Sequence, residues 1–431
     1  MADIAPFCGV RYNLANARAP AERLLAPPYD VISPEERQRL VALDGHNVVR
    51  LILPDGEGDD KYANAARQMK AWLDEKVLER DVRPAYYRYH QSFFAEGQSF
   101  LRKGFICRIR LHRFDEGIIL PHERTLSGPK LDRLKLKRAT RTHLSQVFGL
   151  YSDRDRKSDA PFAAIEKQAP ELEAKTSDGV MQRLWRLEDR TAQQQLTQFF
   201  IDKKIYIADG HHRYETMLAL RDELRPQFPS SRSLQYGSIF LANMDDPGLV
   251  VFPTHRVLHS LQSFDVRALM SRARRFFTVE EGGTEPAGSV RAHLAKLGES
   301  APAFALAHAA GIAYLTLRED ADLSQVKSLA AAEVLRGLDV TLLHALIFEE
   351  LCGIDQKAQT EQRNLRYLKD AAQALAEANA SGVQAVFLMN PTKVAQVKAV
   401  ADAGLVMPQK STFFYPKLAS GLVFNPIIDD V

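Results

Sequence analysis

The sequence predicts an α+β fold, on three observations. Apolar runs of strand length mix with helical spacings, but without the regular strand–helix–strand order of a parallel α/β sheet. A chain of 431 residues, 45% hydrophobic and 26% charged, is large enough for two or three hydrophobic cores. The sequence holds no internal repeat and no low-complexity tract. These features indicate a globular α+β protein with more than one core.

The first 155 residues are expected to contain strands and helices in mixed order. Pro27-Pro28-Tyr29-Asp30-Val31 closes an irregular segment, because two prolines keep the backbone extended. Ser33 before Pro34 predicts the cap of a helix. Apolar spacing then predicts strands at 47–53, 85–94 and 104–111, and a helix at 61–76.

A loop with three consecutive ionisable residues follows. Pro121-His122-Glu123-Arg124-Thr125 precedes a Gly-Pro turn and a basic helix predicted over 131–142. A solvated charged face accounts for most basic residues of that helix. The loop itself is of the kind that holds functional residues on a rigid scaffold.

The most informative stretch runs from Ile205 to Leu220. An apolar strand, Ile205 to Ala208, is followed by Asp209-Gly210-His211-His212-Arg213 and then by good helix formers. A strand that enters a helix through a glycine turn gathers backbone N–H groups and the positive end of the helix dipole. The stretch therefore predicts a phosphate-binding corner, although Asp209 could also be a simple helix cap.

The rest of the chain continues the mixed pattern. Strands are predicted at 182–187, 236–243 and 385–389, and a hairpin at 304–308 and 312–317. Helices are predicted at 163–175, 191–202, 267–277, 341–351 and 363–380, and a loop at 280–286. Pro253-Thr254-His255-Arg256 places a second His-Arg pair at a strand end, which supports a shared anion pocket.

The ADGHHRYET segment resembles the signature of an uncharacterised prokaryotic family, domain of unknown function number one thousand and fifteen. The resemblance also covers the Pro27–Val31 and Pro121–Thr125 motifs, Asp132-Arg133-Leu134, Pro253–Arg256, Met407–Thr412 and Tyr415-Pro416-Lys417. More distantly, the DGHHR corner is similar to that of ParB/sulfiredoxin-like proteins and of free serine kinases. This resemblance implies a ParB/sulfiredoxin-like core with an N-terminal elaboration and a C-terminal α+β region. The expected domains are 1–155, 156–265 with the DGHHR corner, and 266–431.

The function that these observations favour is a phosphotransferase using ATP or ADP with Mg²⁺, and free serine is the leading acceptor by resemblance. Catalysis of this kind is mostly positioning and electrostatic stabilisation of phosphoryl oxygens. The predicted catalytic residues are Glu123 as base, Asp209 and His212, with Asp209 also holding Mg²⁺. The predicted phosphate- and nucleotide-binding residues are Gly210, His211, Arg213, His255, Arg256 and Lys410.

Two other classes of function stay open. A ParB-like regulatory protein would bind nucleotide at the corner without turnover. A metal-dependent hydrolase would use His122, His211 and His255 as ligands, but the sequence has no HxH or HExxH spacing.

The composition limits the partners and the location that we expect for the protein. The net charge is +3 and no long basic run is present, so nucleic-acid binding is not expected. The sequence holds neither a secretory signal pattern nor an apolar run of about 20 residues, so we expect a cytoplasmic protein without membrane contact. The three cysteines are far apart and predict neither disulfides nor a zinc site. The oligomeric state is left open.

Overall fold

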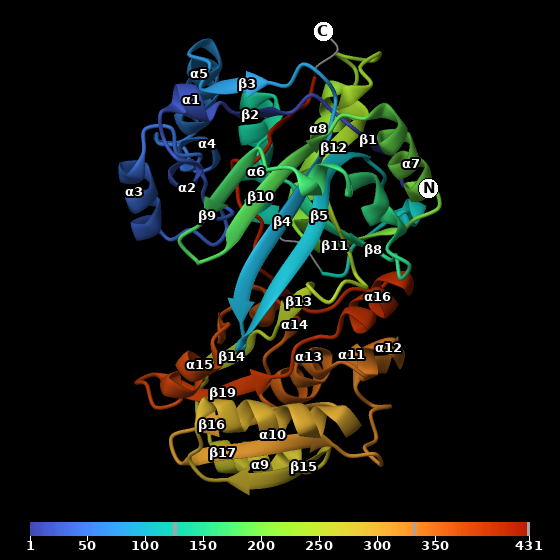
Figure 1. Cartoon of the computed structure of the whole chain (residues 1–431). Coiled ribbons are helices and arrows are strands. Elements are labelled where there is room, and N and C mark those ends of the chain that lie inside the picture. Colours follow the sequence, from blue (N-terminus) through green and yellow to red (C-terminus); the bar gives the residue numbers. More distant parts are fainter. Residues whose placement is uncertain (124–126, 331–332, 429–431) are drawn as a thin grey trace. The chain divides into compact units, whose positions relative to one another are not determined.

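The computed structural model describes residues 1–123, 127–330 and 333–428 (Figure 1). Contacts divide the chain into two compact units, which are described separately. Unit 1 comprises Met1–Pro121, Thr125–Val250 and Pro416–Val431, and unit 2 comprises His122–Arg124 and Val251–Tyr415. The α+β class is confirmed, whereas the ParB/sulfiredoxin-like assignment and the three predicted domains stay predictions.

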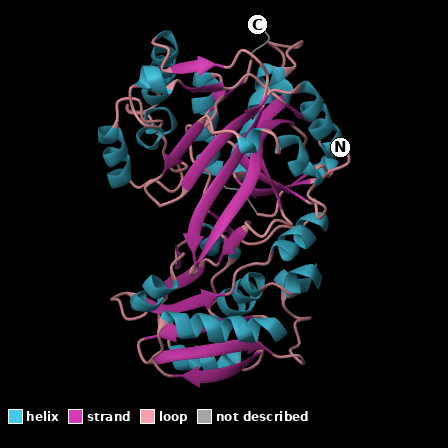
Figure 2. Ribbon diagram, in the orientation of Figure 1, coloured by secondary structure: helices cyan, strands magenta, loops and turns pink. Residues whose placement is uncertain are grey.

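Unit 1 is built on one large mixed sheet (Figure 2). Its strand order is β6 (Ile119–Leu120), β11 (Ile205–Asp209), β8 (Val147–Tyr151), β12 (Tyr236–Asn243), β5 (Gln98–Arg110), β4 (Tyr86–Ala95), β10 (Met181–Leu187) and β9 (Leu172–Lys175), with β1 (Ile4–Ala5) also paired to β5. β8 is parallel to β12 and antiparallel to β11. The strand that carries the DGHHR corner therefore lies between two partners, β6 and β8, near one end of the strand order.

The helices of unit 1 form two groups around this sheet. α1 (Leu14–Ala17), α2 (Ala21–Leu24), α3 (Pro34–Leu43), α4 (Val49–Ile52) and α5 (Asp60–Asp74) lie together on one side of the unit (Figure 1). Their core includes Trp72 and Leu136, the latter from α6 (Ser127–Thr140). α7 (Arg190–Phe200) and α8 (His211–Leu224) pack on the sheet through Phe200 and Met217.

Short strand pairs and the last residues of the chain complete unit 1. β2 (Val10–Tyr12) pairs with β3 (Leu78–Arg80), and β7 (Thr142–His143) pairs with β21 (Asn425–Pro426). Phe424 exchanges two backbone hydrogen bonds with Val10 and is fully buried. The C-terminal segment is therefore part of the fold of unit 1.

Unit 2 contains a six-stranded antiparallel sheet. Its order is β15 (Phe277–Gly282), β17 (Gly311–Leu317), β16 (Ala303–His308), β19 (Val383–Met389), β14 (His255–His259) and β18 (Leu365–Leu368). Helices α9 (Val266–Ala273), α10 (Ala287–Ser300), α11 (Lys327–Ala330), α12 (Glu333–Arg336), α13 (Asp339–Leu342), α14 (Gln356–Thr360), α15 (Ala371–Glu377) and α16 (Val394–Asp402) and a π-helical segment, Leu343–Leu351, accompany it. A separate two-stranded sheet joins β13 (Val250–Phe252) and β20 (Phe413–Tyr415).

Most predicted elements are confirmed, but the strand predicted at 47–53 is wrong. The segment forms the short helix α4, and Val49, Leu51 and Ile52 are all buried. Asn47 begins this turn, because its Oδ1 accepts a hydrogen bond from Val49 N while its Nδ2 donates to Arg23 O and Leu25 O. Three of its four residues are buried, and a helix this short and this apolar does not show the periodic polar face by which a helix is recognised in a sequence.

Other predictions are wrong in their boundaries or type. The helix predicted at 163–175 is wrong: the segment forms a three-residue 3-10 turn, Ile165–Lys167, and then β9, whose burial alternates. The helix predicted at 363–380 divides into β18 and α15, which Asp370 caps. α9 ends at Ala273, and β15 extends to Gly282 into the predicted loop.

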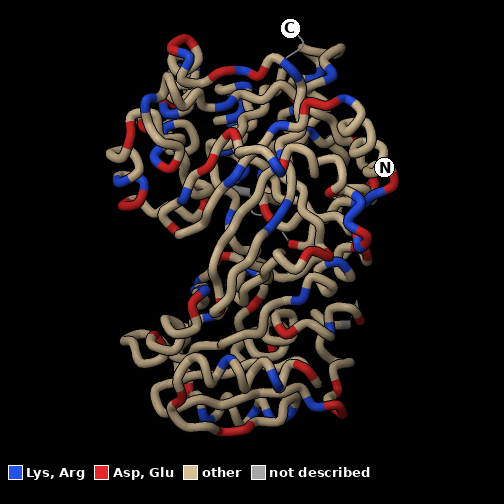
Figure 3. The backbone as a smooth tube through the Cα atoms, in the orientation of Figure 1, with Lys and Arg blue, Asp and Glu red and all other residues tan. Residues whose placement is uncertain are grey.

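Two general features are the distribution of charged residues and the apolar character of the helices. Lys and Arg alternate with Asp and Glu along the backbone of both units (Figure 3). Within the three described segments, no helix combines the length and the apolar composition that a bilayer crossing requires.

Candidate functional site

The predicted strand–turn–helix corner is confirmed. β11 ends at Asp209, Gly210 follows, and α8 starts at His211. The pairing of β11 with β8 shifts between Ile207 and Asp209, and such a bulge re-aims the residue that follows it. Gly210 has φ 89°, a left-handed conformation that glycine adopts without strain, and it is the N-cap residue of the helix. Because glycine has no side chain, the N-cap residue itself does not cap the first-turn N–H groups of α8.

Arg213 is directed back onto the corner. Its Nη2 donates to Asp209 Oδ2 at 2.9 Å, and its Nη1 donates to Gln146 O. Its side chain is 5% exposed, so the guanidinium is a buried part of the corner. A Cβ on Gly210 would lie 2.7 Å from Arg213 Nε, so only glycine leaves room for this arrangement.

Lys417 brings a second cation to the same carboxylate. Lys417 Nζ lies 3.4 Å from Asp209 Oδ2, and the two side chains are 17% and 21% exposed. Burial acts to raise the pKa of Asp209, but the charges of Lys417, Arg213 and His211 outweigh it and hold the pKa well below its usual value. Asp209 is therefore ionised at neutral pH, between two cations.

A buried arginine holds the segment that carries Lys417. Arg102 Nη2 donates to Pro416 O at 2.6 Å and to Gln91 Oε1, and Gln91 Nε2 donates to Lys417 O at 3.0 Å. The Arg102 guanidinium stacks 4.7 Å from the centre of the Phe148 ring. Its burial lowers the pKa to about 10, so it remains charged. These contacts fix the backbone from which Lys417 reaches Asp209.

The basic helix of the sequence is α6, and its interpretation as a solvated face is only partly right. Lys135 and Arg138 are partly exposed and pair with Asp59 and Glu223. Arg133 and Lys137 are 6% and 7% exposed, so the interpretation is wrong for both. Buried cations on this helix are therefore part of the interior of unit 1.

Glu123 lies in unit 2, where backbone groups hold it. Its Oε1 accepts hydrogen bonds from Ser411 N at 3.0 Å, Thr412 N at 3.3 Å and Thr412 Oγ1 at 3.3 Å. His122 is fully buried beside it, with Nε2 2.9 Å from Thr412 Oγ1. Among the described residues no donor contacts Glu123 Oε2, which is the oxygen that could take a proton. Arg124 and Thr125 of the same motif lie outside the described residues.

His255 and Arg256 are buried in unit 2. His255 Nδ1 accepts a hydrogen bond from Met389 N at 3.2 Å, and burial together with Arg256 lowers its pKa to about 4. Arg256 donates to Thr254 O, to Lys410 O at 3.1 Å and to His344 Nε2 at 3.4 Å. Lys410 is exposed and has a left-handed backbone, φ 58°.

The candidate site residues thus fall into two groups. Asp209, Gly210, His211, His212 and Arg213 belong to unit 1, and Glu123, His255, Arg256 and Lys410 belong to unit 2. The convergence of Glu123, Asp209 and His255 on one pocket stays a prediction.

Sequence reasoning missed two residues of the corner. Lys417 belongs to the Tyr415-Pro416-Lys417 motif, which carried the family resemblance and could have indicated it. Arg102 gave no such signal, because it lies inside a strand whose pattern is that of an ordinary β-hairpin.

Asp209 is the residue that the sequence predicts as the magnesium ligand. Both cations contact its Oδ2, and within the described part of the chain Oδ1 has no protein partner. One free, ionised carboxylate oxygen fits Mg²⁺, which usually takes one or two carboxylates and completes its shell with phosphate and water. In the described residues, no three His, Cys, Asp or Glu side chains are grouped to hold a metal by themselves.

The matches to solved structures are weak, both in sequence identity and in TM-score. A conserved hypothetical protein from Pyrococcus furiosus is 14% identical, with 74% of this chain and 94% of that chain covered and a TM-score of 0.36. A free serine kinase in complex with AMP is 12% identical, with 74% and 91% covered and a TM-score of 0.37. SbnI with a C-terminal truncation from Staphylococcus aureus is 12% identical, with 75% and 87% covered and a TM-score of 0.35.

The family is shown by a match to the sequence itself. No curated protein matches the chain. Residues 4–341 match the family described as protein of unknown function, DUF1015. This match spans well over half of the sequence and includes the DGHHR corner, so the chain belongs to the DUF1015 family.

Proposed function

We propose that the chain is a nucleotide-dependent phosphotransferase that acts on a small hydroxyl substrate, with free serine as the first candidate. The observation that carries the proposal is the corner at the start of α8. There an ionised carboxylate, two cations and a helix N-terminus whose N-cap residue is glycine lie around one turn. This combination provides both donors and positive charge for phosphoryl oxygens.

Each part of the corner has a separate task in this proposal. The N–H groups of the first turn of α8 bind phosphate oxygens, and Lys417, which is partly exposed, offsets their charge. Arg213 keeps Asp209 in position from its buried side, and each of its two Nη atoms already donates one hydrogen bond within the protein. Arg213 therefore acts as a positioning residue, while Lys417 takes the phosphate-contacting role that the sequence predicted for Arg213.

Asp209 would hold Mg²⁺ through Oδ1. When bound, the ion would supply positive charge that offsets the negative charge of the phosphate. Lys417 and Arg213 remain on Oδ2, so they keep the carboxylate ionised and oriented.

Glu123 is proposed as the base for the acceptor. In the transfer, the acceptor oxygen forms a bond to phosphorus, the bond from phosphorus to the nucleotide breaks, and Glu123 takes the hydroxyl proton. Three donors fix Oε1, so the carboxylate has one orientation and can use Oε2.

Phosphorus NMR tests the proposal. The protein is incubated with Mg²⁺, ATP or ADP, and a panel of free amino acids with and without hydroxyl groups. A new phosphomonoester signal with serine, and none with alanine, is the expected result. Nucleotide binding without any transfer would instead support the ParB-like regulatory alternative, and the absence of nucleotide binding would contradict both.

A further inference from the structure

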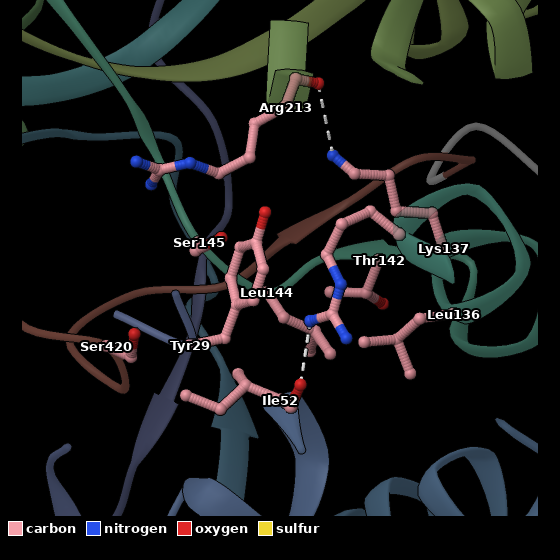
Figure 4. A pocket seen from close by; sticks show the side chains of 10 residues that line it. Tyr29, Ile52, Leu136, Lys137, Thr142, Leu144, Ser145, Arg213 and Ser420 are labelled. Atoms are coloured by element: carbon pink, nitrogen blue, oxygen red, sulfur yellow. Dashed lines mark hydrogen bonds between the residues drawn. The ribbon is translucent and has the colours of Figure 1, made fainter. Parts of the chain in front are cut away.

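A small cavity of unit 1 lies beside the corner, on the side of α6 (Figure 4). Its volume is about 20 Å³, enough for roughly one water-sized group. The lining includes three cations, Arg133, Lys137 and Arg213, together with the side chains of Tyr29 and Ser145. None of the described residues that line it is a carboxylate. The described lining of the cavity therefore contains cationic side chains and no anionic one.

The three cations differ in how their charge is balanced. Arg133 donates to Asp132 Oδ2 at 2.8 Å, and Arg213 donates to Asp209 Oδ2 at 2.9 Å. Lys137 has no carboxylate partner among the described residues. Its one hydrogen bond joins Nζ to Arg213 O at 3.5 Å, the dashed line in Figure 4. An ammonium group has three donors, so Lys137 is the least satisfied of the three.

Burial makes this imbalance costly. Lys137 is 7% exposed, and an unpaired buried ammonium either loses its proton or requires an anion. Burial and the charges of Arg213 and Arg133 lower the pKa of Lys137 to about 7. The two other ionisable groups around Lys137, His143 and Tyr29, do not supply a negative charge. His143 on β7 is buried, and burial and Lys137 hold its pKa well below its usual value. Burial raises the pKa of Tyr29, which stays neutral.

We propose that this cavity is a binding site for a small monovalent anion of the halide class, held by Lys137 and completed by hydroxyl donors. The Tyr29 hydroxyl points to the side where Lys137 and Arg213 meet (Figure 4). In the described part of the chain neither Tyr29 nor Ser145 uses its hydroxyl in another hydrogen bond. Space for roughly one water-sized group admits a halide and excludes a phosphate group.

The anion would act on the corner through the backbone. Lys137 Nζ donates to the carbonyl of Arg213, the residue that orients Asp209. The site includes Arg213, which lies in the first turn of α8, but it uses neither Asp209 nor Lys417. Anion binding at Lys137 can therefore be measured without the proposed phosphotransferase activity.

The affinity for the anion should fall as the pH rises. The anion binds the protonated form of Lys137, so the pKa is higher in the bound state. Affinity is full below about pH 7 and weakens about tenfold per pH unit above it, as Lys137 of the free protein loses its proton.

Thermal unfolding tests the proposal on the full chain. Sodium chloride is titrated against sodium gluconate at constant ionic strength, at pH 6 and pH 9, with sodium phosphate as a second arm. At pH 6 we expect the midpoint to rise about 1.5–3 °C for each tenfold increase in chloride above the dissociation constant. At pH 9, where the affinity is about a hundredfold weaker, the midpoint should stay nearly constant over the same chloride range. Lys137→Met should abolish the chloride effect while it keeps the packing of the side-chain stem.

Lys135→Met is the matched control, because Lys135 lies on the same helix but is 30% exposed and pairs with Asp59. This variant should keep the wild-type response. A crystal soaked in bromide provides a second readout that does not depend on a variant, and an anomalous peak is expected beside Lys137 Nζ. A chloride response that persists in Lys137→Met, a larger response to phosphate than to chloride, or a bromide map without that peak would each overturn the proposal.

Discussion

Asp209 carries two cations on a single oxygen, with Arg213 Nη2 at 2.9 Å and Lys417 Nζ at 3.4 Å. Its ionised form is therefore a structural requirement of the corner as well as a candidate for chemistry. Nothing in the order Asp-Gly-His-His-Arg distinguishes these two roles, because the partner Lys417 is distant in sequence. The presence of the corner could be predicted from local pattern, whereas its electrostatic balance could not.

Asp209→Asn should separate charge from shape. The amide keeps the geometry but leaves Arg213 buried without a counter-charge, so we expect a loss of about 3–5 kcal/mol in the free energy of unfolding at pH 7. Mg²⁺–nucleotide binding and turnover should fall together. Urea unfolding and titration calorimetry measure the two effects.

The pH dependence of that loss has a defined sign. The pKa of Asp209 is lowered in the folded state, so its stabilisation is present above the unfolded value of about 3.9 and disappears as pH falls through the lower folded value. The difference between wild type and Asp209→Asn should therefore shrink as the pH is lowered from 4 towards 2. A difference that is constant over this range would contradict the assigned charge.

Glu123→Gln tests the base. An amide can still accept at Oε1 from Ser411 and Thr412, but it cannot take a proton. Nucleotide affinity should remain near that of wild type while kcat falls by roughly 10²–10⁴-fold. Single-turnover kinetics and calorimetry on the same preparation provide the check. Turnover at the wild-type rate would assign the base to another residue.

At the scale of elements, the strand–turn–helix corner was predictable because its signals are local. Apolar residues define β11, glycine defines the turn, and helix formers define the start of α8. The prediction of a strand at 47–53 was wrong because its signals are not local: the burial of α4 depends on residues elsewhere in its core. The prediction of a solvated face was wrong for Arg133 and Lys137 of α6 for a similar reason, because a sequence does not show which face of a helix is covered.

Gly210→Ala tests the turn as an element. The substitution adds a left-handed strain of about 1–3 kcal/mol and a contact with Arg213 Nε at 2.7 Å. Gly179→Ala is the matched control, because Gly179 has φ 82° but no atom within 4 Å of the added Cβ. Gly210→Ala should lose more stability than the control in urea unfolding and should also lose nucleotide binding. Equal losses, with binding retained, would show that the contact with Arg213 has no role.

At the scale of the whole molecule, unit 1 is discontinuous and includes Pro416–Val431. Leu418, Leu422, Val423, Phe424 and Ile427 are each at most 5% exposed. At about 1.5–3 kcal/mol for each buried apolar side chain, their removal would cost roughly as much as the whole stability of a domain.

A pair of truncations tests this dependence. A chain that ends at Tyr415 loses these side chains and Lys417, and we expect it not to fold, as circular dichroism and thermal unfolding would show. A chain that ends at Ile428 keeps every contact described here and should unfold like the full chain. A folded protein ending at Tyr415 would contradict the assignment of the C-terminal segment to unit 1.

The central claim is that the corner at the start of α8 binds the phosphates of a nucleotide, and Lys417 is its most direct probe, since Arg213→Ala would also remove buried contacts of the fold. Titration calorimetry with Mg²⁺ and ADP is carried out on wild type, Lys417→Gln and the control Lys135→Gln. The loss of one hydrogen bond to a charged group, about 1.5–3 kcal/mol, should weaken the affinity of Lys417→Gln by roughly 10- to 150-fold and leave the control unchanged. Equal affinity in all three folded proteins would contradict the claim.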